Sequence, residues 1–170
     1  VIVARYGFAK GLVLVCCLFA GVVFAESADQ MIEQGNAYWA ENKPDLAEQQ
    51  FKQAIDADPG SLAAHKQLAA LYMSQNKNQQ AIEAYQAAIT LQPDNASLFV
   101  GICLAYLHEG SFSASHAMCS QALKLDPEME NARKLQSYID GKMAAQRENQ
   151  SAAQPATDAG QMPETVKHKQ

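Results

Sequence analysis

Apolar residues in the middle of this chain recur at the spacing of amphipathic helices, and the whole pattern returns every 34 residues. In the clearest copy, Gly35 and Tyr38 share one face of a first helix, Phe51 and Ala54 share one face of a second, and Pro59 closes the unit. The equivalent residues are Ala69, Tyr72, Tyr85, Ala88 and Pro93 in the next copy, then Cys103, Tyr106, Cys119, Ala122 and Pro127. The pattern predicts three helix–turn–helix units, at about 28–61, 62–95 and 96–129.

The ends of the expected helices carry their own signals. Asn42, Asn76 and Gly110 stand where the two helices of each unit must be joined, and Asn and Gly readily adopt the left-handed conformation that ends a helix. Ser27 and Gln30 have the spacing of a capping box, which predicts that the first helix begins there.

A further helix is expected at 130–148, after the third unit. Its apolar face is Leu135, Tyr138, Ile139 and Met143, and its other face is polar. A terminal helix of this kind covers the last apolar surface of a repeat array. The remaining residues, 149–170, are rich in Ala, Gln, Pro, Thr and Lys and are expected to form a disordered tail.

The small–Tyr…Ala–Phe…Ala…Pro frame and its period resemble the tetratricopeptide repeat (TPR) family over about 28–129. The resemblance implies an all-α fold, a right-handed α-solenoid of three TPR units plus a C-terminal capping helix. It also implies a non-catalytic protein–protein interaction module, which binds a peptide or protein segment in a concave groove lined by the first helix of each unit.

The residues of the first helices that are expected to line this apolar groove are Ile32, Asn36, Trp39, Lys66, Ala70, Met73, Val100, Leu104, Leu107 and His108. The family's best-known ligand mode grips a C-terminal carboxylate with Lys, Asn and Arg side chains. In this chain Asn36 fits one of those places and Gln67 lies near another, but Ile32, Ser97 and Gly101 replace the basic residues. We therefore expect an apolar groove, with Lys66 as its fixed charge, to bind a partner of unknown identity. A second copy or the chain's own tail are alternative occupants.

The first residues of the chain have the order of a secretory signal peptide. Arg5 and Lys10 precede the apolar run 11–24, and Ala25 offers a small residue for cleavage before Glu26. The run from 11 to 25 has 15 residues, fewer than the ~20 of a membrane-spanning helix. We expect cleavage after Ala25 and a periplasmic or secreted protein. An uncleaved inner-membrane anchor is the alternative.

Charge narrows the choice of partners. The formal net charge is −5, and it becomes −7 without 1–25, because that segment holds two of the 13 basic residues and none of the 18 acidic ones. An acidic chain without a basic run is not expected to bind nucleic acid, nor a membrane surface after signal cleavage.

No enzymatic chemistry is predicted. The sequence contains no Gly-rich phosphate loop, nucleophile elbow or HExxH motif, and we expect neither catalytic residues nor a cofactor. His116, Cys119, Cys103 and His108 do not have the spacing of a structural zinc site, so no metal is expected.

Cys103 and Cys119 are expected on the inner faces of the two helices of the third unit. An oxidising compartment would permit a disulfide between them. The alternative is two small buried side chains with free thiols.

Together these features predict a scaffold or assembly factor of the bacterial cell envelope. The alternatives are a membrane-tethered accessory subunit of an envelope enzyme complex, for example in cytochrome maturation, and a self-associating TPR protein.

Overall fold

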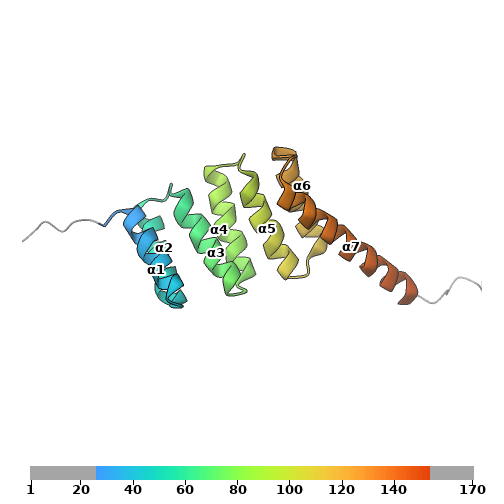
Figure 1. The fold of residues 1–170 in the computed structure, drawn as a ribbon, viewed down its shortest axis with the longest axis horizontal. Coiled ribbons are helices and arrows are strands. Elements are labelled where there is room, and N and C mark those ends of the chain that lie inside the picture. The colour runs from blue at the N-terminus through green and yellow to red at the C-terminus, as the bar shows by residue number, and fades with distance from the viewer. Residues whose placement is uncertain (1–25, 154–170) are drawn as a thin grey trace, which may run out of the picture.

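The computed structural model describes residues 26–153, which form seven helices standing side by side in chain order (Figure 1). The helices are α1 (Ala28–Ala40), α2 (Pro44–Ala57), α3 (Leu62–Ser74), α4 (Asn78–Leu91), α5 (Ala96–His108), α6 (Phe112–Leu125) and α7 (Glu130–Ala153). No helix among these is long and apolar enough to cross a membrane. The predicted signal peptide and the residues from 154 onward lie outside the described part of the chain.

The helices begin with the period of the sequence. The first helices start at Ala28, Leu62, Ala96 and Glu130, and the second helices start at Pro44, Asn78 and Phe112. Each first helix packs against the second helix of its unit, and each second helix packs against the next first helix. The predicted all-α array of three units and a capping helix is confirmed.

The turns have the expected backbone conformation. Asn42, Asn76 and Gly110 have φ angles of 58°, 57° and 73°. Ser27 accepts a hydrogen bond from the Gln30 backbone amide, and the Gln30 side chain accepts one from the Ser27 amide, which completes the capping box. The signals for the ends of the helices were therefore readable from single residues.

Close contact within each unit depends on small side chains. A Cβ atom placed on Gly35 would lie 2.5 Å from the ring of Phe51, so only glycine lets α1 approach that ring. Ala47 and Ala54 of α2 are also fully buried. These contacts form the core of the first unit.

The helix α7 covers the end of the array and is longer than expected. Its Ala132 and Ile139 are fully buried, while Arg133 and Lys134 are exposed. It continues to Ala153, past the expected boundary at 148, and its C-terminal part extends away from the other helices (Figure 1). Residues 149–153 therefore belong to the helix and not to the expected tail, because Ala and Gln both favour a helix once one has started.

A carboxylate joins the first two units. Glu48 on α2 accepts hydrogen bonds from the Tyr72 hydroxyl of α3 (3.0 Å) and from the ammonium groups of Lys52 (2.7 Å) and Lys77 (3.3 Å). Partial burial alone raises the pKa of Glu48, but these hydrogen bonds outweigh burial and hold its pKa below the ordinary 4.5. The ionised form of Glu48 therefore stabilises the fold.

We predict that Glu48→Gln lowers the free energy of unfolding by about 1 kcal/mol at neutral pH. Because the folded-state pKa of Glu48 lies below its unfolded value, this contribution is complete above pH 4.5 and is lost as the pH falls through the folded-state pKa. Urea unfolding of both proteins at about pH 7 and about pH 3 measures the difference, which should shrink in acid. Glu33→Gln, at an exposed position of α1, is the control. A difference that does not depend on pH would contradict this role for Glu48.

Candidate functional site

The residues predicted to line the groove lie on α1, α3 and α5. We define the candidate groove as those of the predicted positions that leave side-chain surface open to solvent, together with Tyr138 of α7. Lys66, Leu104 and His108 are exposed. The half-buried members are Asn36, Trp39, Ala70, Met73 and Leu107.

Two predicted groove residues belong to the core instead. Ile32 is only 8% exposed and packs in the cluster that contains Leu68 and Leu71. Val100 is 7% exposed and packs in a cluster with Ala122 and Ala132. Both residues lie on the same side of their helices as the other predicted groove residues. At these two positions, however, later helices of the array cover the side chain.

Tyr138 is a candidate groove residue that sequence reasoning missed. We expected it on the buried face of α7, but its side chain is 53% exposed. It lies 34 residues after Leu104, which is 36% exposed at the equivalent place of α5. The ammonium group of Lys142 lies 5.2 Å from the centre of the Tyr138 ring. The repeat period was the signal that could have found this position, because α7 begins in register with α5.

The structure shows why this groove lacks the basic carboxylate clamp. A Cβ atom on Gly101 would lie 2.5 Å from the ring of Tyr85, so no longer side chain fits there without displacing that ring. Ile32, at the place of a clamp lysine, is buried. Asn36 keeps its place on α1 without these basic neighbours.

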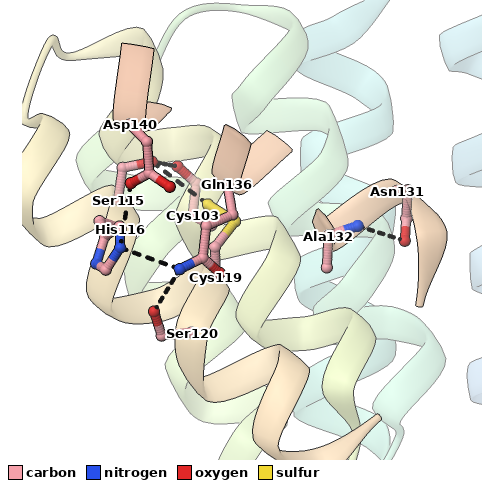
Figure 2. The surroundings of a disulfide bond; sticks show 9 residues. All are labelled: Cys103, Ser115, His116, Cys119, Ser120, Asn131, Ala132, Gln136 and Asp140. Atoms are coloured by element: carbon pink, nitrogen blue, oxygen red, sulfur yellow. Dashed lines mark hydrogen bonds and ion pairs between the residues drawn. A yellow bond between two sulfur atoms is a disulfide. The ribbon is translucent and has the colours of Figure 1, made fainter. Parts of the chain in front are cut away.

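A disulfide between Cys103 and Cys119 joins α5 to α6, with a Cα–Cα distance of 5.4 Å (Figure 2). These residues occupy the places of Gly35 and Phe51 in the first unit, where a small residue packs against a ring. Ile139 of α7 packs on the two cysteines. The covalent link therefore stands where the other units use an aromatic contact.

Polar contacts hold α7 beside the disulfide. His116 Nε2 on α6 lies 3.3 Å from an Asp140 carboxylate oxygen and 3.0 Å from the side-chain amide of Gln136, and that amide donates to the Ser120 hydroxyl at 3.0 Å (Figure 2). The buried Ser115 hydroxyl donates to the carbonyl of Cys103 at 2.7 Å. The α7 residues that extend the groove are thus fixed on the last unit.

The described histidines and cysteines give no indication of a metal site, and His65 is hydrogen-bonded to the backbone. His65 Nε2 lies 3.2 Å from the carbonyl oxygen of Pro59, which can only accept, so this nitrogen donates. Within residues 26–153 no three His, Cys, Asp or Glu side chains are grouped to hold a metal ion.

Comparison with known proteins agrees with the period and the fold. Two models of the tetratricopeptide repeat family match residues 32–96 and 73–138. This chain belongs to the tetratricopeptide repeat family, whose helical arrays typically serve as non-catalytic protein-interaction modules.

One related protein and two solved structures are similar to this chain in sequence or in fold. The protein STIP1 homolog of Dictyostelium discoideum is 28% identical over 103 residues, which cover 61% of this chain and 18% of that protein. The structure of the first TPR of Spaghetti (RPAP3) bound to the HSP90 peptide SRMEEVD has a TM-score of 0.64 at 21% identity, over 69% of this chain and 96% of the other. The Sgt2 TPR domain from Aspergillus fumigatus has a TM-score of 0.64 at 17% identity, over 81% and 91% of the two chains. These structures share the fold of this chain.

We predict opposite effects for two glycine substitutions in helices. Gly101→Ala should lower the free energy of unfolding by about 1–3 kcal/mol, because its methyl group would overlap the Tyr85 ring. Gly141→Ala is the matched control, since no atom lies within 4 Å of its Cβ position. It should stabilise α7 by up to about 1 kcal/mol through helix propensity. Urea unfolding, monitored by circular dichroism, measures both free energies of unfolding. An equal gain in stability from the two substitutions would show that the Tyr85 ring does not exclude a side chain at position 101.

Proposed function

We propose that this chain binds an extended or helical segment of a partner protein along the candidate groove and acts as a scaffold or assembly factor. The observation that carries the proposal is a series of large apolar side chains with open surface on successive first helices. They are Trp39, Met73, Leu104, Leu107 and Tyr138. Apolar surface of this kind on a protein in solution marks an interaction site, and Trp, Tyr and Met are favoured residues at interfaces.

Recognition in this groove rests on apolar contact more than on a carboxylate clamp. Lys66 is exposed on α3, and Lys142 adds a positive charge beside Tyr138 on α7. The two clamp places that are closed by Ile32 and Gly101 cannot present basic side chains. The partner segment is therefore expected to insert apolar side chains between the exposed ones of the groove, with its polar groups facing solvent and the lysines.

The test is the double variant Trp39→Ala, Leu104→Ala in affinity capture from an extract of the source cells. Partners retained by the parent chain should fall at least about tenfold, because truncating central apolar anchors weakens binding most. Leu91→Ala is the matched control, since Leu91 is 38% exposed on the second helix α4 and lies outside the groove. Circular dichroism verifies that all variants keep their helices. Unchanged capture by the helical double variant would contradict the proposal.

We further propose that the protein works in the bacterial envelope, released into the periplasm after removal of 1–25. The order of charge, apolar run and small residue at the start of the chain supports this location. The Cys103–Cys119 disulfide supports it independently, since such bonds persist in oxidising compartments. The alternatives are a membrane-tethered accessory subunit of an envelope enzyme complex, which keeps 1–25, and a self-associating protein.

Intact-mass measurement of protein from the source cells tests both features at once. We predict a chain that begins at Glu26 and whose two remaining cysteines react with an alkylating reagent only after reduction. A mass that retains 1–25 would favour the tethered subunit. Alkylation of both thiols in the native, unreduced protein would contradict the disulfide.

A further inference from the structure

A pocket of about 380 Å³ lies between the second helices of the first two units, away from the candidate groove. We call it the junction pocket. It is lined by Lys52, Ile55, Asp56, His65, Leu68, Tyr72, Gln80, Glu83 and Ala84, which come from α2, α3 and α4. Apolar side chains and acidic side chains therefore meet in one hollow, to which α2 and α4 contribute Asp56 and Glu83 respectively.

The junction pocket exists because two side chains of the repeat are small or polar at this place. One period further on, His65 is replaced by Phe99 and Ala84 by Met118. At that second junction Met118 packs against the buried cluster of Ile82, Ile102 and Ala105 from α4 and α5. Phe99 packs against a cluster of buried residues from α5, α6 and α7. The second junction therefore has the larger apolar side chain of Met118 where the first junction has Ala84.

The polar groups of the junction pocket favour a cation. The ammonium group of Lys52 forms an ion pair with the Glu48 carboxylate at 2.7 Å, and this pair offsets the positive charge of Lys52. Asp56 and Glu83 form no ion pair within residues 26–153, and Glu83 accepts a single hydrogen bond, from Gln79. The pocket therefore carries two carboxylates whose charge is not balanced there.

We propose that the junction pocket binds an arginine side chain of a partner protein. The aliphatic stem would pack on Ile55 and Leu68, as the stems of long basic side chains do on apolar surface. The guanidinium group would donate to Asp56 and Glu83. Arginine suits this site better than lysine, because its planar fork presents five donors and can bridge carboxylates that stand on different helices.

The junction pocket is separate from the groove, so the two sites could hold two segments at once. Its lining comes from α2, α4 and the side of α3 that packs against them. The groove residues of α3, which are Lys66, Ala70 and Met73, do not line the junction pocket. This second site does not depend on the proposed function of the groove.

Titration of the full chain with N-acetyl-arginine methylamide, followed by methyl NMR signals, tests the proposal. We expect saturable shifts of the Ile55, Leu68 and Ala84 methyl groups at up to about 50 mM probe. The lysine and norleucine counterparts should bind more weakly. Asp56→Asn with Glu83→Gln should weaken the arginine probe about tenfold or more, because charge-assisted hydrogen bonds are lost.

Two further variants make the result specific. Glu33→Gln with Glu109→Gln removes the same charge from exposed positions outside the pocket and should leave binding of the probe unchanged. His65→Phe with Ala84→Met copies the second junction and should abolish binding while the helices persist. Equal binding of the norleucine probe, no saturable shift at these methyl groups, or full binding by the Asp56→Asn, Glu83→Gln variant would each overturn the proposal. The pocket would instead belong to a second copy of the chain if the protein forms a dimer, the dimer shows these same methyl shifts, and Arg147→Ala returns it to the monomer. That result would overturn the proposal of a foreign partner.

Discussion

The close packing of the two helices within each unit is the contact on which the rest of the structure depends. Gly35 admits the Phe51 ring in the first unit, and the same two places hold Ala69 and Tyr85 in the second. Because this contact recurs at a fixed period, every first helix takes an equivalent place in the array. The candidate groove is a consequence of that repetition, since it is made of first-helix residues that neither partner helix covers.

In the third unit a disulfide replaces the contact between a small residue and an aromatic ring. Cys119 stands where a ring stands in the other units, and its disulfide to Cys103 keeps α5 and α6 in contact. Ile139 of α7 packs in one buried cluster with these two cysteines. The link that closes the last unit is therefore also part of the surface on which α7 docks, and Tyr138 reaches the groove only while α7 is docked.

The sequence predicted the helices, their turns and their order, because each rests on local signals. The left-handed turns at Asn42 and Gly110 are examples. It was wrong about Ile32 and Val100, whose exposure depends on helices that are distant in sequence. It was also wrong about Tyr138, because an apolar residue beside Ile139 looks like part of the same buried face.

The junction pocket could not have been predicted in the same way. Nothing in a single repeat indicates a hollow, and His65 taken by itself carries no sign of one. A comparison of the two junctions shows that His65 and Ala84 stand at the places of the apolar Phe99 and Met118, and that Met118 packs between α4 and α5. Such a hollow arises where one copy of the repeat has a smaller side chain than another copy, and its shape depends on helices that are distant in sequence.

Photo-crosslinking in the source cells can show whether partners bind the surface of the first helices. A photoreactive phenylalanine analogue would be placed at Leu104 or Tyr138 in the groove and, for comparison, at Leu91 on the second helix α4. The same partner protein should be crosslinked from positions 104 and 138 and not from position 91. Crosslinks from position 91 alone, or none from the two groove positions, would contradict binding at this surface.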